Sequence, residues 1–190
     1  MPTLYLVPSL EASQYYRSGP LSTENAGFDL YVPQTTVFAP GERKMVNMGV
    51  KAAMVSSEDD DHDHDHGHAH PLAYSNGCRT TDPFHSHDDY HGETGTTGSI
   101  TFQNFWLLPR SSISNTGLMM TNSVGVIDKS YRGDLIASLW NTKNETVTVT
   151  QGQRLVQIVA RDMGDITRCL LIKCLPESGR GDGGFGSSGL

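Results

Sequence analysis

Short runs of strand-forming residues, each ended by a residue that breaks a strand, dominate this sequence. The runs are rich in Val, Ile, Leu, Thr and Tyr, and Gly, Pro, Asn and Asp lie between them, as in β-strands joined by tight turns. In 145–150 the apolar Val147 and Val149 alternate with threonines, which is the period of a half-buried strand. Many such strands predict an all-β sandwich or barrel, with one short helix over 111–120 as the exception. The expected strands are 3–7, 27–32, 35–39, 44–54, 100–107, 124–127, 134–140, 145–150, 154–160 and 168–174.

One segment, residues 56–98, departs from the strand pattern. The chain has 190 residues, so a single domain over 1–190 with a sizeable core is expected. The segment holds all eight histidines and ten of the 21 acidic residues, with Arg79 as its one basic residue. It has no periodic apolar face, so it cannot bury a core of its own. We therefore predict an acidic His-rich loop, disordered and inserted in the connection between two strands.

Five histidines recur at every second position of this segment. In an extended chain their imidazoles lie on one side, and such rows bind zinc, nickel or copper ions. A functional metal site also needs fixed geometry and supporting contacts around its ligands. A solvated loop with adventitious metal binding is the expectation, an evolved metal role is the alternative, and no reaction follows from either. The five are His62, His64, His66, His68 and His70.

The rest of the chain is nearly neutral, with thirteen basic and eleven acidic residues. No cluster of Lys and Arg resembles a nucleic-acid-binding surface, no stretch approaches a transmembrane span, and the start, MPTLYLVPSL, does not read as a signal peptide. Three cysteines without a C-x-x-C pattern fit a reducing compartment, and Cys169 and Cys174 are expected to pack as small apolar residues. We therefore predict a cytoplasmic or nuclear protein without nucleic-acid or membrane partners.

Five separated stretches form a set that resembles the five motifs of the trimeric dUTPase family, in the family's order. Each stretch alone is weak evidence for the resemblance, but the order and spacing of all five make it specific. The resemblance covers residues 1–55 and 99–190, so the His-rich insertion lies between the first and second motifs. The stretches are NAGFDLY (25–31), LPRSSIS (108–114), NSVGVIDKSYRGDL (122–135), GQRLVQI (152–158) and RGDGGFGSSG (180–189).

The resemblance implies a distorted jelly-roll (β-clip) domain that forms a homotrimer with shared active sites. It implies hydrolysis of dUTP to dUMP and pyrophosphate by water attacking the α-phosphate, which controls the dUTP pool and supplies dUMP for thymidylate synthesis. One chain offers the base-binding hairpin, a second its second and fourth motifs, and a third its C-terminal tail. Mg²⁺ is implied as cofactor, held by substrate phosphates and water without a direct protein ligand.

The third motif carries the residues closest to the chemistry. Asp128 matches the carboxylate that orients and activates the attacking water, and a turn-capping Asx residue is the alternative. Tyr131 matches the tyrosine under the deoxyribose, whose ring excludes a 2′-hydroxyl; an interior tyrosine with a bonded hydroxyl is the alternative. The hairpin would read uracil as though it were an added strand. Its expected contacts come from Asn122, Gly125, Val126 and Ile127.

The first, second and fourth motifs are expected to surround the phosphates. By resemblance, Ser111 donates to phosphate oxygens, with Ser112 beside it, and Arg110 supports the subunit interface. Gln157 matches a glutamine that meets phosphate or metal-bound water, and a polar residue on an exposed strand edge is the alternative. Asp29 is interpreted as an architectural carboxylate that holds the site together.

The glycine-rich tail, 176–190, is expected to be a mobile arm that becomes ordered over the ligand. Arg180 can form two parallel hydrogen bonds with the γ-phosphate, and Phe185 can stack on the uracil ring. A plainly disordered terminus is the alternative. The remaining expected contacts of the arm, to phosphate oxygens, come from Gly186, Ser187 and Ser188.

Two other functional classes remain as alternatives. A dCTP deaminase has the same fold, but it places a glutamate five residues after the glycine of the third motif, where this chain has Ser138. A catalytically silent or regulatory binding protein could use the acidic insertion as its interaction surface. The presence of Asp128, Tyr131, Arg180 and Phe185 argues against a silent protein.

Overall fold

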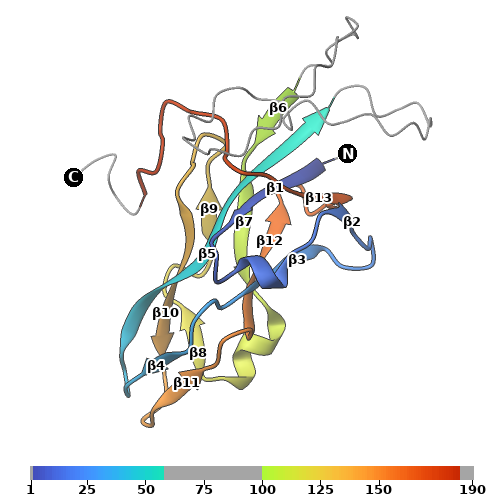
Figure 1. The fold of residues 1–190 in the computed structure, drawn as a ribbon. Coiled ribbons are helices and arrows are strands. Elements are labelled where there is room, and N and C mark those ends of the chain that lie inside the picture. The colour runs from blue at the N-terminus through green and yellow to red at the C-terminus, as the bar shows by residue number, and fades with distance from the viewer. Residues whose placement is uncertain (1, 58–99, 185–190) are drawn as a thin grey trace, which may run out of the picture.

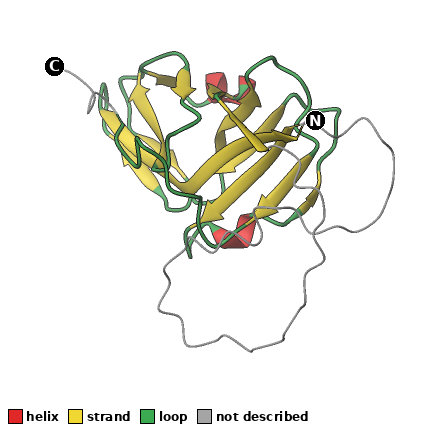
Figure 2. Cartoon of the chain, turned by 90° about the horizontal axis from the view of Figure 1, so that it is seen from above, coloured by secondary structure: helices red, strands yellow, loops and turns green. Residues whose placement is uncertain are grey.

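The fold is built almost entirely from β-strands. The computed structural model describes residues 2–57 and 100–184, and within these ranges it contains no α-helix, only two short 3-10 turns, η1 (Ser13–Tyr15) and η3 (Ser111–Asn115). Figure 2 shows these turns at the periphery of the strands. The strands are β1 (Pro2–Pro8), β2 (Gly19–Pro20), β3 (Gly27–Tyr31), β4 (Thr36–Phe38), β5 (Arg43–Ser57), β6 (Ile100–Gln103), β7 (Phe105–Pro109), β8 (Leu118–Met120), β9 (Gly125–Ile127), β10 (Asp134–Asn141), β11 (Val147–Val149), β12 (Arg154–Ala160) and β13 (Arg168–Leu171).

Two larger sheets enclose a common core in a distorted jelly-roll arrangement. The first sheet has the order β2-β13-β1-β5-β10-β8, with β6 also paired to β5; the second has the order β3-β12-β7-β9, and β11 pairs with β4 separately. Figure 1 shows the 15-residue β5 running the length of the domain. Because β5 pairs with β1, β6 and β10, it ties the large sheet together. The prediction of an all-β domain is confirmed.

Aliphatic side chains from both sheets meet in this core. Leu4 of β1 and Leu135 of β10 come from the first sheet, and Leu107 of β7 and Leu155 of β12 come from the second; each is at most 1% exposed. Burial of each such side chain contributes roughly 1.5–3 kcal/mol. The shared core therefore fixes how the loops at the strand ends lie relative to one another.

Each expected strand has a counterpart, but several boundaries differ; β13, for example, ends at Leu171 rather than at 174. The predicted strand 100–107 is two strands, β6 and β7, which pair in different sheets. The chain passes between the sheets at Asn104, whose side chain accepts a hydrogen bond from the Lys129 N–H (2.8 Å). The predicted helix over 111–120 is wrong after residue 115, because Gly117 has a φ of 80° and the following residues pair with β10 as β8.

A buried asparagine closes the end of β10. The strand buries alternate residues, and Asn141 continues that inward face at 0% exposure. Its amide donates to the carbonyls of Ala39 (2.9 Å) and Glu145 (2.8 Å), and its Oδ1 accepts from the Lys143 N–H (3.0 Å). One polar side chain thus satisfies backbone groups of three separate loop positions.

Replacing Asn141 with alanine should lower the free energy of unfolding by about 3 kcal/mol, because each buried group left without its partner costs about 1–3 kcal/mol. Urea denaturation measures this change. The matched control is Asn144→Ala, an exposed asparagine in the same turn, which should change stability by less than about 0.5 kcal/mol. Equal effects of the two substitutions would contradict the assignment.

The expectation for the cysteines holds in part. Cys169 is buried and free, as expected of a small apolar residue. Cys174 is disulfide-bonded instead, and it lies beyond the end of β13 rather than on the strand. Among the described residues, no helix is long and apolar enough to cross a membrane.

Candidate active site

A pocket of about 180 Å³ lies where β9 and the start of β10 meet the C-terminal segment, and we call it the hairpin pocket. The pocket gathers most of the residues that the sequence assigns to the base, the sugar and the attacking water. It is therefore the first candidate site. The predicted residues in its lining are Asn122, Gly125, Val126, Ile127, Asp128, Tyr131 and Arg180.

Asp128 stands in a fixed turn directly after β9. The Tyr131 N–H donates to the Asp128 carbonyl (2.9 Å), and the Lys129 N–H donates to Asn104 Oδ1 (2.8 Å). These two bonds hold the turn, while the Asp128 side chain stays 44% exposed at the pocket. Its carboxylate pairs with the guanidinium of Arg180. Because this partner comes from the tail, the turn-capping alternative has no support from the described contacts.

The ring of Tyr131 is held against two glycines. Its hydroxyl donates to the Asp134 carbonyl (2.8 Å), and burial raises the pKa of that hydroxyl above its ordinary value. A Cβ added at Gly133 would lie 2.5 Å from the hydroxyl oxygen, and one at Gly184 would lie 3.3 Å from the ring. Tyr131 thus has the bonded hydroxyl of an interior tyrosine and also lines the pocket.

Strand β9 offers an open edge at the pocket. It is the last strand of its sheet and pairs with β7 on one side only. Before it, Ser123 turns the chain with a φ of 59°, and Gly125 lies close to Leu107. Backbone groups on the outer edge of β9 are therefore placed to bond an extended ligand edge, as an added strand would do.

A second hollow, of about 660 Å³, contains the predicted phosphate-contacting residues, and we call it the arginine pocket. Asp29 lies at its centre, with Oδ1 2.6 Å from Arg110 Nε and Oδ2 2.9 Å from Arg154 Nη1. One carboxylate between two guanidiniums leaves net positive charge for an anion. Its lining includes Arg17, Asp29, Arg110, Ser111, Arg154 and Gln157.

The contacts of Asp29 support the architectural interpretation. Arg154 was not predicted from the sequence, although it lies in the fourth motif, two positions after Gly152. Only the pairing of β3 with β12 brings it to Asp29. Arg110 also reaches Ser112 Oγ (3.3 Å), while Ser112 itself is exposed beside the pocket.

Gln157 lies on a central strand. Strand β12 pairs with β3 on one side and with β7 on the other, so the alternative of a polar residue on an exposed strand edge is wrong. The side chain lies over Gly27, where an added Cβ would collide with the Gln157 amide. Glycine at position 27 is thus what lets Gln157 reach the arginine pocket.

The predicted site residues divide between these two pockets, which share no lining residue. A single chain therefore does not bring Asp128 together with Ser111 or Gln157 in one hollow. Four predicted contacts of the tail lie outside the described residues: Phe185, Gly186, Ser187 and Ser188.

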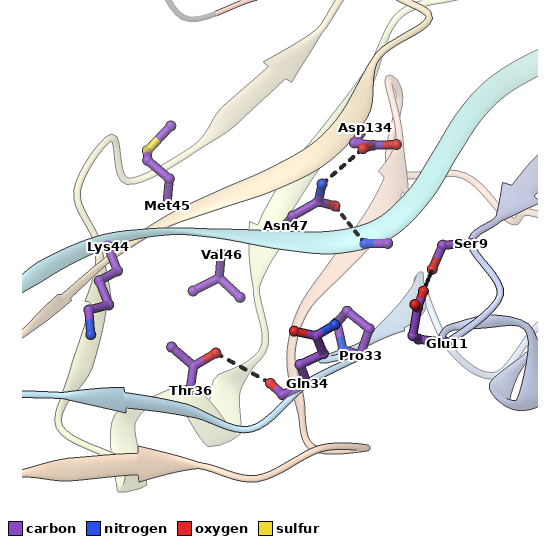
Figure 3. Close-up of a pocket in the computed structure, with 11 residues that line it drawn as sticks. Ser9, Glu11, Pro33, Gln34, Thr36, Lys44, Met45, Val46, Asn47 and Asp134 are labelled. Atoms are coloured by element: carbon purple, nitrogen blue, oxygen red, sulfur yellow. Dashed lines mark hydrogen bonds between the residues drawn. The ribbon is translucent and has the colours of Figure 1, made fainter.

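A further hollow, of about 390 Å³, lies between β5 and the loop before β4 (Figure 3). None of the predicted site residues lines it. Asn47 donates to Asp134 Oδ2 (2.8 Å) and accepts from the Gly49 N–H (2.7 Å), as the dashed lines in Figure 3 show. Asn47 thereby fixes Asp134, whose carbonyl accepts the hydrogen bond from the Tyr131 hydroxyl.

No group of three or more His, Cys, Asp or Glu side chains among the described residues could hold a metal ion. The histidine row, His62 to His70, lies outside those residues.

Comparison with known proteins gives a consistent family. The model of the dUTPase family matches residues 102–189. The chain is 39% identical over 84 residues to the deoxyuridine 5′-triphosphate nucleotidohydrolase of Aeromonas salmonicida (strain A449), covering 44% of this chain and 55% of that protein. It is 42% identical over 84 residues to the protein of that name from Legionella pneumophila (strain Paris), with the same shares covered. The chain thus spans about half the length of the curated relatives it matches.

Solved structures give weaker likenesses. A dUTPase from Streptococcus mutans aligns with a TM-score of 0.45 and 22% identity, over 83% of this chain and 92% of that one. A Staphylococcus bacteriophage 80alpha dUTPase G164S mutant with dUpNHpp aligns with a TM-score of 0.49 and 19% identity, over 99% of both chains. The sequence matches are the stronger finding: over residues 102–189, this chain is similar to the dUTPase family.

Proposed function

We propose that this chain hydrolyses dUTP to dUMP and pyrophosphate, with water attacking the α-phosphate. The observation that carries the proposal is the hairpin pocket, where Asp128, Tyr131, the open edge of β9 and Arg180 converge. The matched relatives carry the name of this activity. In a cell, the reaction would control the dUTP pool and supply dUMP for thymidylate synthesis.

The base and sugar would be selected in the hairpin pocket. The β9 edge supplies fixed backbone donors and acceptors for the uracil ring, and cytosine would reverse that pattern and leave buried groups unpaired. The hydroxyl of Tyr131 is bonded, and Gly133 and Gly184 lie so close to its side chain that a Cβ at either position would meet it. A ring held under the sugar in this way would exclude a 2′-hydroxyl.

Asp128 would act as the general base. Its carboxylate is exposed at the pocket and held by a turn with two backbone bonds, so it can orient water and accept its proton. Arg180, which pairs with this carboxylate, carries the charge that a triphosphate would attract. Transfer of Arg180 to the phosphates would leave Asp128 free to bind water.

The arginine pocket would reach the phosphates from a second copy of the chain. Since the two pockets share no lining residue, a complete site needs Ser111 and Gln157 from a neighbour. This division supports a closed symmetric oligomer with shared sites, because such an assembly repeats one contact at every subunit. The homotrimer is the form that the family resemblance implies.

Mg²⁺ is the proposed cofactor, held by substrate phosphates and water. The donors here suit this arrangement, since guanidinium, hydroxyl and amide groups dominate the arginine pocket, and Mg²⁺ prefers oxygen ligands and keeps several waters. When bound, the ion would neutralise phosphate charge. The residues facing it, Ser111 and Gln157, would orient the phosphates and their bound water by hydrogen bonds.

A nucleotide panel tests the proposal. The full chain is incubated with magnesium and dUTP, dCTP, dTTP or UTP, and both pyrophosphate and ammonia are measured. Pyrophosphate from dUTP, at a rate far above that from the other three nucleotides, is expected. Ammonia from dCTP would indicate a deaminase, which the position of Ser138 on β10, bonded to Thr121 Oγ1, does not favour. Binding of dUTP without turnover would indicate a silent protein.

A further inference from the structure

Strand β5 is distorted where it faces the start of β10. The pairing register shifts between Asp134 and Ile136 of β10, whose partners on β5 are Lys51 and Asn47. Residues 48–50, which we call the β5 bulge, therefore lie opposite a single residue of β10. Extra residues of this kind interrupt the ladder of backbone hydrogen bonds and bend the strand. Contacts of side chains then decide how firmly the two strands are held at this point.

Gly49 lies at the centre of the β5 bulge. It has a φ of 66°, a conformation that residues with a side chain rarely adopt, and its carbonyl accepts a hydrogen bond from the Ser9 N–H (2.7 Å). A Cβ added at Gly49 would lie 3.0 Å from Ser9 Oγ and 3.2 Å from Pro33 Cγ. The bulge is thus packed against the turns that follow β1 and β3.

Asn47 bonds the bulge and the neighbouring strand with one amide. Its Oδ1 accepts from the Gly49 N–H (2.7 Å), and its Nδ2 donates to Asp134 Oδ2 (2.8 Å), as Figure 3 shows. The first bond spans two residues, which is the habit of asparagine in turns, and the second crosses to β10. Asn47 therefore ties the β5 bulge to the first residue of β10.

Asp134 lies between two hollows. It lines both the hollow of Figure 3 and the hairpin pocket. Its carboxylate accepts from the Asn47 amide, and its carbonyl accepts from the Tyr131 hydroxyl (2.8 Å). A single residue thus connects Asn47 to the ring that lines the hairpin pocket. Any shift of Asp134 moves the acceptor to which that ring is bonded.

We propose that Asn47 is a positioning residue for sugar selection: by holding Asp134, it sets where the ring of Tyr131 lies beneath the sugar. Asn47 lies outside the five motifs. The inference rests on the proposed function, in which the ring excludes a 2′-hydroxyl. Rejection of a hydroxyl by shape alone is a small free-energy difference, so a loosened ring changes it measurably.

An exchange of partners tests the contact. Asn47→Asp keeps an acceptor for the Gly49 N–H, but it removes the donor to Asp134 and sets two carboxylates against each other. Adding Asp134→Asn returns a donor to the pair, with the direction of the hydrogen bond reversed. Wild type, both single variants and the double variant form a cycle that separates the contact from the effects of each residue alone.

The first readout is kcat/KM for dUTP divided by kcat/KM for UTP. Asn47→Asp should lower this ratio by roughly threefold to tenfold, the scale of one lost hydrogen bond, and the double variant should recover most of it. Asn144→Asp, at an exposed asparagine that lines neither hollow, is the matched control and should keep the ratio of wild type. A general loss of folded protein lowers both rates in proportion. An unchanged ratio in Asn47→Asp, or no recovery in the double variant, would overturn the proposal.

The second readout follows the ring of Tyr131 without any nucleotide. Chains labelled with 3-fluorotyrosine give fluorine resonances in NMR spectra, and Tyr131→Phe identifies the resonance of Tyr131. This resonance should shift or broaden in Asn47→Asp and return toward its wild-type position in the double variant. The resonance of Tyr5, a fully buried tyrosine of β1 identified in the same way, should stay in place.

The two readouts distinguish failure of this inference from failure of the proposed function. A Tyr131 resonance that is the same in Asn47→Asp and wild type would overturn the inference, whether or not dUTP is hydrolysed. A wild-type chain that does not hydrolyse dUTP, together with the expected fluorine result, would contradict the proposed function and support the placement of Tyr131 by Asn47.

Discussion

Asp128→Asn should lower the turnover of dUTP by roughly 10²–10⁴-fold, the range that a positioned general base supplies. Asparagine keeps the shape of the side chain but cannot accept the proton of the attacking water. The substitution also removes the charge that pairs with Arg180, so that guanidinium becomes free for phosphate. We therefore expect the dissociation constant for a non-hydrolysable dUTP analogue to stay the same or fall while kcat collapses.

Single-turnover kinetics and equilibrium binding separate these two quantities. Asp165→Asn, at an exposed aspartate on the loop after β12, is the matched control and should retain full turnover. The unfolding midpoint of Asp128→Asn should lie close to that of wild type, because the side chain is 44% exposed and solvent-screened ion pairs contribute little to stability. Turnover in Asp128→Asn comparable to wild type would remove Asp128 from the role of base.

Deleting residues 179–190 should cut kcat by roughly 10²-fold or more, since it removes Arg180 and the other phosphate contacts proposed for the tail. Stability should change much less. The truncation leaves Pro176 and Ser178 in place, and these residues make the bonds to Arg132 and Ser130. None of the removed residues that the structure describes, 179–184, belongs to the hydrophobic core.

The deletion is checked by measuring kcat, the unfolding midpoint and the mass of the assembly side by side. A chain that lacks only Leu190, the residue after the fifth motif, is the control and should behave as wild type. A truncated chain that dissociates or unfolds together with its loss of turnover would show a structural role for the tail rather than a chemical one.

Both variants probe one arrangement of charge. Arg180 and Asp128 form an ion pair in the hairpin pocket. Asp29 likewise forms ion pairs with two guanidiniums in the arginine pocket. A triphosphate that bridges the pockets of two chains would take the arginines into its own ion pairs. Binding energy from the phosphates could then be used to expose the base to water.

The sequence by itself determined the class of fold and supplied most of the candidate site residues. Strand periodicity is local: it depends on residues two apart, as in Val147 and Val149, and it survives whatever the strand later pairs with. The motifs around Asp128 and Tyr131 are also contiguous, so their residue types and spacing could be recognised without a structure. The sequence could not show that 100–107 changes sheets at Asn104, because its two halves pair with strands that lie elsewhere in the chain, β5 and β12.

Only the tertiary structure decided which of these residues meet. Asp29 and Arg154 are 125 positions apart and are joined by the register of β3 with β12, so Arg154 gave no local signal. In the same way, the division into two pockets and the return of the arm to Asp128, 52 positions before Arg180, follow from where strands end around a common core. Contacts between loops depend on that packing, and no periodic pattern within one segment encodes them.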